Sequence, residues 1–173
     1  VREVAAQTLD KLNWKPDNIE DQIAYLAAKN DWNSIVAIGR PAVPSLAVLL
    51  ESKYEFVREP AAQVLGQIGA TANEAISALV AALKNKDVFV RALVAKALGQ
   101  IGVAAKDAIS GLVAALKDEA PVVRAAAAQA LDKQNWKPDS DEDRSAYLIA
   151  KKDWNGVVAM GQSAVPNLIL LLK

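Results

Sequence analysis

The hydrophobic positions of this chain recur at the spacing of a helix. They stand three or four residues apart, as a helical period of about 3.6 residues requires. The clearest stripes are Ile76, Leu79, Val80 and Leu83, and Val57, Ala61, Leu65 and Ile68. Aromatic residues make up only 5% of the chain, and Ala, Leu and Val supply most of the hydrophobic content. This pattern predicts an all-α protein with closely packed helices.

The predicted helices are repeated along the chain. A Val-Arg pair followed by an Ala- and Leu-rich helix begins at Val1, Val57, Val90 and Val123. The middle two units read VREPAAQVLGQIG and VRALVAKALGQIG, and each is followed by a second helix, NEAISALVAALKN or KDAISGLVAALKD. A lone pair of helices cannot bury its hydrophobic stripe, whereas stacked pairs share a continuous core. We therefore expect one elongated solenoid domain over residues 1–173, built from antiparallel helix pairs.

The outer two units are longer than the middle two. The interval from Val1 to Val57 is 56 residues, 23 more than the 33 of a short unit. The insertion begins WKPDNIEDQIAYLAAKNDWN in the first unit and WKPDSDEDRSAYLIAKKDWN in the last. Residues 1–51 align with 123–173 without a gap, with about 32 identities. The predicted units are long (1–56, insertion 14–38), short (57–89), short (90–122) and long (123–173, insertion 136–160). We expect the insertions to break the superhelix and to give each end a bulge.

Helix start and stop signals divide the chain into about twelve helices. Capping boxes are predicted in the insertions, where Asp17 pairs with Glu20 and Asp139 with Glu142. They predict a helix over 19–29, followed by a shorter one over 32–38 that stops at Gly39. We expect Gly69 and Gly102 to follow helix ends, and Pro60 and Pro121 to fall in or just before first turns. Neither end of the chain reads as a polar cap, which predicts either a longer array or end-to-end self-association.

The V-R-x-x-A-A-x-x-L-G-x-I-G phrase at 57–69 and its near copy at 90–102 resemble HEAT repeats, in particular the HEAT-like repeats named after phycobilisome lyases. The phrases AVPSL, AISAL, AISGL and AVPNL match the second helix of that repeat. The resemblance covers the chain outside the insertions. It implies a right-handed superhelix whose concave face is lined by the Val-Arg helices. The family usually has an acid three residues before the Val; Asp87 fits, but Tyr54 and Ala120 do not, so an Asp–Arg ladder is only partly supported.

Positions that flank the buried stripe of the Val-Arg helices are expected to point outward and to bind a partner protein or peptide. They are Glu59, Pro60, Gln63 and Gln67, then Ala92, Leu93, Lys96 and Gln100, then Ala125, Ala126, Gln129 and Lys133, with Glu3, Val4, Gln7 and Lys11 in the first helix. Phe56, Phe89 and Val122 stand just before each Val-Arg pair. They fit either packing between repeats or an apolar ridge for a partner.

Two further sets of repeated residues are assigned structural roles. The arginines Arg2, Arg58, Arg91 and Arg124 are expected to bond to acids or helix-end carbonyls of neighbouring repeats, the alternative being a binding stripe. The tryptophans Trp14, Trp32, Trp136 and Trp154 all lie in the insertions and are expected to fill the core of the extra helices. The alternative is a ligand pocket with Tyr25 and Tyr147, but a unique ligand site would not need a second copy 122 residues away.

Composition excludes several kinds of chemistry. The chain has no Cys and no His, which excludes disulfides and His- or Cys-based zinc sites or catalysis within it. Asp139, Asp141 and Asp143 resemble the start of a calcium loop, but Arg144 stands where the turn glycine belongs and Ala150 where the last ligand belongs. We expect no metal and no cofactor. No apolar run approaches the roughly 20 residues of a membrane span, so no membrane partner is expected.

These observations favour a cytoplasmic, non-enzymatic scaffold that binds a protein or peptide on the concave face. The absence of Cys fits a reducing compartment. Two alternatives remain. The resemblance to phycobilisome-lyase repeats implies a bilin lyase-like or chaperone-like subunit that acts on phycobiliproteins. The other is nucleic-acid binding by the concave face, against which the net charge of zero argues.

Overall fold

The computed structural model describes residues 1–69 and 73–172, and every regular element in them is helical. The α-helices are α1 Arg2–Lys11, α2 Ile19–Ala28, α3 Trp32–Ile38, α4 Val43–Leu50, α5 Glu55–Gly69, α6 Asn73–Ala82, α7 Val88–Ile101, α8 Ile109–Ala115, α9 Pro121–Lys133, α10 Asp141–Ala150, α11 Trp154–Ala159 and α12 Val165–Leu170. Three short 3-10 helices join some of them, η1 Arg40–Ala42, η2 Gly102–Ala108 and η3 Gly161–Ala164. The all-α prediction is confirmed.

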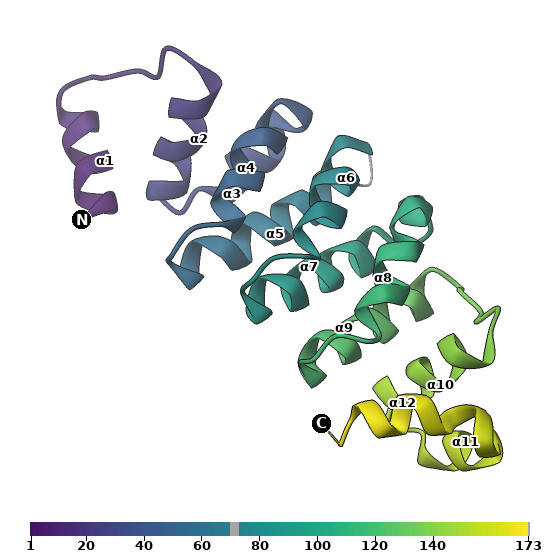
Figure 1. Cartoon of the computed structure of the whole chain (residues 1–173). Coiled ribbons are helices and arrows are strands. Elements are labelled where there is room, and N and C mark those ends of the chain that lie inside the picture. Colours follow the sequence, from purple (N-terminus) through teal and green to yellow (C-terminus); the bar gives the residue numbers. More distant parts are fainter. Residues whose placement is uncertain (70–72, 173) are drawn as a thin grey trace.

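The helices stack side by side into an elongated solenoid, with the two termini at opposite ends (Figure 1). The Val-Arg helices α5, α7 and α9 form one layer, and α4, α6 and α8 with η2 form the other. Contacts within the first layer are the more extensive. One continuous core runs through both layers from α2 to α10 and joins all four units.

Small residues explain why the Val-Arg helices lie so close together. A Cβ on Gly99 would stand 3.0 Å from the Cα of Ala130, and one on Gly66 would stand 3.3 Å from the carbonyl oxygen of Ala97. These contacts are with backbone atoms, which cannot move unless a whole helix moves. Glycine at the two positions therefore sets the spacing between α5, α7 and α9.

The first insertion continues the stack through contacts with α4 and α5, and the bulge predicted at each end stays a prediction. In the first long unit α2 packs on α4 and α3 packs on α5, while α1 packs on α2. In the other long unit α10 packs on α9 and α12. Each insertion thus supplies the second helix of one pair and the first helix of the next. Ile23 and Ile35 of the first insertion are buried in the same core as the repeats, whereas Ile149 and Val157 of the second form a separate cluster.

The predicted capping boxes are displaced by one residue. The N-cap of α2 is Asn18, whose side chain accepts a hydrogen bond from the Asp21 N–H at 2.8 Å. The N-cap of α10 is Ser140, which accepts from the Asp143 N–H at 3.1 Å. Both residues are in extended backbone directly before the helix, which is where a cap must stand. Asp17 and Asp139 lie one residue too early to do so.

The glycine and proline predictions hold in part. Gly39 and Gly102 end α3 and α7 at φ 70° and 65°. Gly69 instead belongs to α5, where a Cβ would clash with Ile101, so its role is close packing. Pro121 opens α9 as predicted. Pro60 lies inside α5 beyond the first turn, because that helix begins upstream at Glu55 rather than at the Val-Arg pair.

One helical stretch, Val88–Ala115, is long and apolar enough to cross a membrane by length and composition alone. It consists of α7, η2 and α8, and its helical path is broken at Ala105, where φ is −94° and ψ is 38°. Of its apolar window 56% is buried inside the fold. The apolar character of this stretch is thus that of the central core helices.

Candidate protein-binding surface

The exposed side of α5, α7 and α9 carries most of the predicted partner-binding residues, and we call it the Val-Arg face. Exposed on it are Glu59, Gln63, Gln67, Lys96, Gln100, Gln129 and Lys133, whereas Pro60, Leu93 and Ala125 are half-buried. Ala92 and Ala126 are buried, so the prediction that they point outward is wrong. Their small side chains lie in the tightly packed layer of Val-Arg helices.

A shallow hollow of about 240 Å³ lies between α7 and α9 on this face. Its rim consists of Lys96, Gln100, Gln129 and Lys133, and its floor consists of Gly99, Ala126 and Ala130. Neither lysine forms an ion pair with any of the residues that the structure describes. The rim therefore offers two positive charges and two amide groups above a floor without large side chains.

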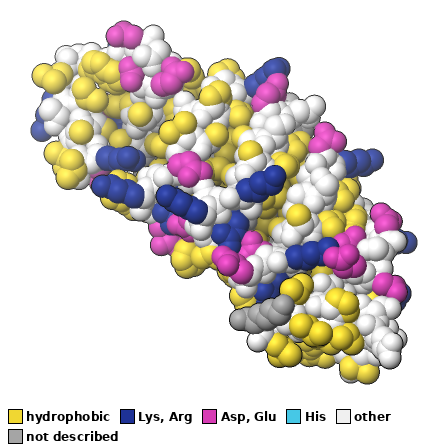
Figure 2. All heavy atoms as spheres, in the orientation of Figure 1, with side chains coloured by type: hydrophobic (Ala, Val, Ile, Leu, Met, Phe, Trp, Pro, Cys, Tyr) yellow, Lys and Arg dark blue, Asp and Glu magenta, His cyan; other side chains and the backbone are white. Residues whose placement is uncertain are grey.

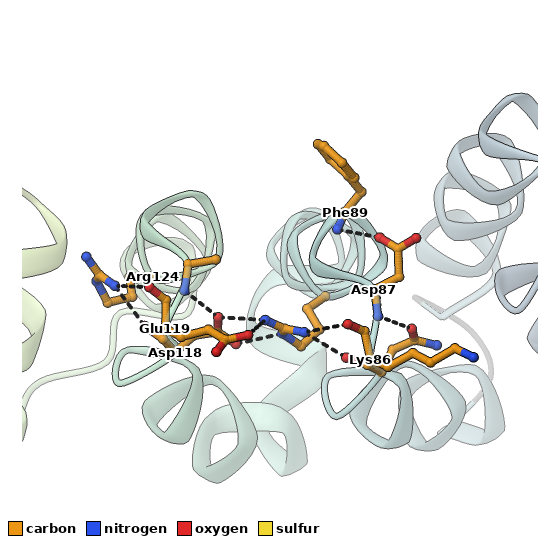
Figure 3. A network of polar contacts seen from close by, with 9 residues as sticks. Lys86, Asp87, Phe89, Asp118, Glu119 and Arg124 are labelled. Atoms are coloured by element: carbon orange, nitrogen blue, oxygen red, sulfur yellow. Dashed lines mark hydrogen bonds and ion pairs between the residues drawn. The ribbon is translucent and has the colours of Figure 1, made fainter. Parts of the chain in front are cut away.

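Phe56, Phe89 and Val122 form a second feature of the Val-Arg face, which we call the apolar ridge. Their exposed fractions are 67%, 55% and 45%, so each stands out from the first turn of its helix. The rings of Tyr54 and Phe56 lie 5.4 Å apart between centroids. Figure 3 shows Phe89 pointing away from the polar network beneath it. This exposure favours the ridge over packing between repeats, because repeat packing would have buried the three side chains.

Arg91 bonds to most groups of that polar network, and Figure 3 labels its partners Lys86, Asp118 and Glu119. Its guanidinium donates to both carboxylate oxygens of Asp118, at 2.7 and 2.9 Å, and to the carbonyl oxygens of Asn85 and Lys86, at 2.9 and 3.2 Å. The two side chains of the pair are only 10% and 12% exposed. A single side chain thus joins the turn before α7 to the turn after α8, and so connects neighbouring repeats.

Arg58 and Arg124 repeat this arrangement with fewer bonds, whereas Arg2 does not. Arg58 donates to the carbonyl of Ser52 at 2.9 Å and lies 3.2 Å from Asp87 of the next unit. Arg124 donates to the carbonyl of Asp118 at 2.8 Å. Arg2 is exposed, and its guanidinium lies 5.2 Å from the centre of the Tyr54 ring. The contacts of Arg58, Arg91 and Arg124 are therefore with repeat turns, away from the Val-Arg face.

The acid that completes the network was missed in the sequence. Asp118 stands five residues before Val123, whereas the family pattern places an acid three residues before. Burial raises the pKa of Asp118, but hydrogen bonds from Arg91 and the Ala120 N–H outweigh it, so the pKa lies below its ordinary value. The hydrogen bond to Asp118 likewise raises the pKa of Arg91. The pair is thus ionised at neutral pH and stabilises the folded turn.

Each long unit contains a further cluster, which we call a staple, formed in the first unit by Asp10, Trp14, Tyr25 and Lys29 and not predicted from the sequence. The Tyr25 hydroxyl and the Lys29 ammonium group both donate to Asp10, the lysine at 3.0 Å, and the Trp14 ring lies 5.7 Å from the Tyr25 ring. The signal that could have revealed it is the 122-residue duplication, because Asp132, Trp136, Tyr147 and Lys151 repeat all four residues with the same contacts.

The charges of these staples are fixed by their hydrogen bonds. Donation from Tyr25 and then from Lys29 lowers the pKa of Asp10. Burial raises the pKa of Asp132, but donation from Tyr147 and Lys151 outweighs it and the pKa is lowered. Burial, followed by the bond to Asp132, raises the pKa of Tyr147, so its hydroxyl remains a donor. In each cluster the Asp, Tyr and Lys side chains are hydrogen-bonded to one another. These bonds connect α1 with α2 and α9 with α10.

The tryptophans do not all have the predicted environment. Trp32 and Trp136 pack against the main core, and Trp14 packs on Tyr25. Trp154, the counterpart of Trp32, is 51% exposed, so its assignment to a core is wrong. The physical reason is that α3, which carries Trp32, packs on α5, whereas no described Val-Arg helix packs on α11 in the same way.

Two cavities of similar size lie in the long units. One of about 390 Å³ is lined by Trp14 and Tyr25 with small residues of α1 and α2. The other, of about 420 Å³, is lined by Arg124, Ala146 and Ile149 with the turn after α8. Within the described residues, no three His, Cys, Asp or Glu side chains converge as a metal site would require. Both cavities are open grooves, the first between α1 and α2 and the second between α9 and α10.

The comparisons with known proteins agree with this architecture. The family described as HEAT repeats matches residues 43–132, which is more than half of the chain and runs from α4 into α9. A comparison with curated proteins finds no match. The matched region contains most of the tightly packed α5–α7–α9 layer. It also contains the bonds of Arg58 and Arg91 to the turns of the repeats. The chain therefore belongs to the HEAT repeat family.

Proposed function

We propose that this protein is a non-enzymatic interaction scaffold that binds a segment of a partner protein on its Val-Arg face. HEAT repeats are commonly protein-interaction scaffolds. The observation that carries the proposal is the apolar ridge, in which Phe56, Phe89 and Val122 stand exposed at repeat spacing. Large exposed side chains in a regular row are typical anchors of a protein interface.

The ridge supplies the affinity in this proposal. Burying a large hydrophobic side chain contributes about 1.5–3 kcal/mol, so covering both phenylalanines would contribute about 3–6 kcal/mol before the cost of association. A partner segment with hydrophobic residues spaced to meet Phe56 and Phe89 would cover both rings. The packed helices already hold the two rings in place. Most of the conformational entropy lost on binding is therefore that of the partner segment.

The hollow beside the ridge supplies the selectivity. Lys96 and Lys133 on its rim favour an acidic residue in the partner, while Gln100 and Gln129 have amide groups that suit a peptide backbone. The proposed ligand is therefore a peptide segment that combines hydrophobic anchors with an acidic residue. Nucleic-acid binding needs several contacts between basic side chains and phosphates, and the hollow has only these two lysines. The chain as a whole has no basic excess, since it carries 20 basic and 20 acidic residues.

A peptide-display selection tests the proposal. A random peptide library is selected against the immobilised chain, and enriched peptides are then measured against a Phe56→Ser/Phe89→Ser variant and a Gln63→Arg/Leu93→Glu/Gln129→Arg variant. Enriched peptides should carry hydrophobic and acidic residues and should lose at least about tenfold in affinity for both variants. Val103→Asp, an exposed hydrophobic position on η2, is the matched control. Equal binding to folded variants, or no enrichment at all, would reject the Val-Arg face.

The bilin lyase-like alternative rests on the resemblance to phycobilisome-lyase repeats and has its own test. A phycobiliprotein with its free bilin is mixed with the chain, and the bilin absorbance is recorded. A shift that persists in the Phe56→Ser/Phe89→Ser variant would favour that alternative over the scaffold.

A further inference from the structure

The side chains of the Val-Arg face form rows that run along the solenoid, across the axes of α5, α7 and α9. Positions 33 residues apart occupy the same place in each of these helices, and so they point the same way. The first row is the apolar ridge of Phe56, Phe89 and Val122. The second row, which we call the track, is Pro60, Leu93 and Ala126, and the third row is Gln63, Lys96 and Gln129.

The track lies lower than the rows on either side of it. The ridge residues are 67%, 55% and 45% exposed, and all residues of the third row are exposed. Between these rows Pro60 and Leu93 are half-buried, and Ala126 is only 3% exposed. At α9 the track opens into the hollow, whose floor also contains Ala126. The track is thus an apolar floor with an apolar row on one side and amide and ammonium groups on the other.

The distance between the two flanking rows favours an extended ligand. The ridge and the third row are seven residues apart on each helix, which is about 10 Å along the helix axis. An extended chain lies about 4.8 Å from a hydrogen-bonded neighbour, so one such chain fits between the two rows. An α-helix is about 10–12 Å in diameter with its side chains. It would rest on the two rows without reaching the track.

The distance between the repeats indicates the period of that ligand. Gly66 and Gly99 bring neighbouring Val-Arg helices close to backbone contact, so we place their axes within the usual range of about 8–10 Å. A polyproline-II chain has three residues per turn and rises about 3.1 Å per residue, so one side of it recurs about every 9.3 Å. One side of a β-strand recurs about every 6.7 Å and would not meet the ridge at successive repeats.

We propose that the partner segment binds along the track in the polyproline-II conformation, with an apolar residue at every third position against Phe56, Phe89 and Val122. Proline is one of these apolar residues. This inference rests on the proposed function, because it specifies the ligand of the same face. A proline-rich segment is ordered in this conformation before it binds, so it loses little entropy, and aromatic side chains commonly line the sites that receive such segments.

The third row suits the backbone of such a segment. The backbone groups of a polyproline-II chain form no internal hydrogen bonds and are available to a neighbour. The exposed Lys96 and Gln129 side chains can donate to its carbonyl oxygens. Gln63 donates to Glu59 at 3.4 Å, and its own carbonyl oxygen can accept from a backbone N–H. The backbone of a helical ligand is already bonded internally and would not use these groups.

The charges of the face favour one acidic residue in the segment. Lys96 and Lys133 lie on the rim of the hollow between α7 and α9, whereas Glu59 is exposed on α5. An acidic residue is therefore favoured between the positions that face Phe89 and Val122, and disfavoured beside α5. On the face drawn in Figure 2, Lys and Arg side chains are mixed with Asp and Glu rather than gathered into one patch. The lysines thus select a single acidic residue rather than an acidic run.

Synthetic peptides of three designs, measured by fluorescence anisotropy, test this inference. The first design has three leucines, each three residues apart, in a proline-rich background with one glutamate. It is made in two versions, with the glutamate in either interval, so that both chain directions can bring it to the lysines. The second design has the same composition with the leucines two and four residues apart. The third is a helix-forming peptide with leucines seven residues apart.

One version of the first design should bind the wild-type chain at least about tenfold more tightly than the second design. Phe89→Ser should weaken this binding at least about tenfold, and the control Val103→Asp, at an exposed position on η2, should leave it unchanged. Lys96→Glu should weaken it about fivefold, and a peptide with lysine in place of the glutamate should regain the affinity for that variant. Circular dichroism confirms that each variant remains folded.

The contrary results separate this inference from the proposed function. Equal affinity for the first two designs would overturn the inference, and so would tighter binding of the helical peptide. If Phe89→Ser weakens the binding of that helical peptide, the Val-Arg face still binds a partner and the proposed function stands. Binding of the first design that is unchanged in Phe89→Ser would instead reject the Val-Arg face as its site, and with it both proposals.

Discussion

Removing the charge of Asp118 should destabilise the centre of the solenoid far more than removing a surface charge. The Arg91–Asp118 pair has exposed fractions of only 10% and 12%, and two bonds of 2.7 and 2.9 Å join the side chains. Asp118→Asn removes the bidentate partner of the buried guanidinium and leaves only the exposed Glu119, at 3.3 Å, as a charged neighbour. Breaking a buried pair from one side costs about 3–5 kcal/mol. The carbonyls of Asn85 and Lys86 remain as acceptors, so we expect about 3 kcal/mol, the lower end of that range.

Urea denaturation followed by circular dichroism measures this loss. With a slope of about 2–3 kcal/mol per molar urea for a chain of this size, the midpoint should fall by about 1 M. Arg40→Gln is the control, because the Arg40–Glu74 pair is 71% and 49% exposed and such pairs contribute about 0–1 kcal/mol. Arg91→Met/Asp118→Leu should recover most of the loss, since it leaves no buried charge. Equal midpoints for Asp118→Asn and Arg40→Gln would refute the reasoning.

The same pair predicts a dependence on pH. The pKa of Asp118 in the folded chain lies below its ordinary value of 3.8. A lowered carboxyl pKa contributes stability that is present above pH 3.8 and is lost as the pH falls through the folded value. The difference between wild type and Asp118→Asn should therefore be constant near neutrality and should close below pH 3.8. A difference that widened in acid would contradict the assignment.

Three further substitutions test the packing, the backbone and the duplicated staple. Leu98→Ala, at a fully buried position of α7, should cost about 2–5 kcal/mol in thermal unfolding, whereas Val48→Ala at an exposed position of α4 should change little. Gly39→Ala, where φ is 70° and no atom lies within 4 Å of a new Cβ, should cost about 1–2 kcal/mol through backbone strain alone. Tyr147→Phe should cost about 1 kcal/mol by removing the donor to Asp132, and no loss in its urea midpoint would contradict that role.

The fold could be predicted from the sequence because the repeats and the spacing of the hydrophobic residues both indicate helices. The stripe of Ile76, Leu79 and Leu83 is buried as predicted, and the duplicated insertions contain helices where the pattern places them. Where the insertion helices pack was not visible, because amphipathic spacing shows that a face is buried but not what it is buried against. Hence the packing of α2 on α4 and of α3 on α5 was not predicted.

The sequence predicted which positions lie on the candidate surface. It did not predict whether the ridge residues are exposed or which acid binds Arg91. The spacing of Gln63, Lys96 and Gln129 indicated a shared exposed side, since positions at the same place in each repeat point the same way. The exposure of Phe56 and Phe89 was undecided, because a phenylalanine before a helix fits packing and binding equally well. Asp118 was missed because its place in the turn, rather than its sequence spacing, brings it to Arg91.

The central claim is that the apolar ridge anchors a partner segment on the Val-Arg face. Its most direct measurement is the affinity of a display-selected peptide for the wild-type chain and for Phe89→Ala, titrated by calorimetry. Phe89 is 55% exposed, so the substitution leaves the core intact. Phe89→Ala should bind the peptide at least about tenfold more weakly than the wild type, which corresponds to about 1.4 kcal/mol. An unchanged affinity, with an unchanged unfolding midpoint, would contradict it.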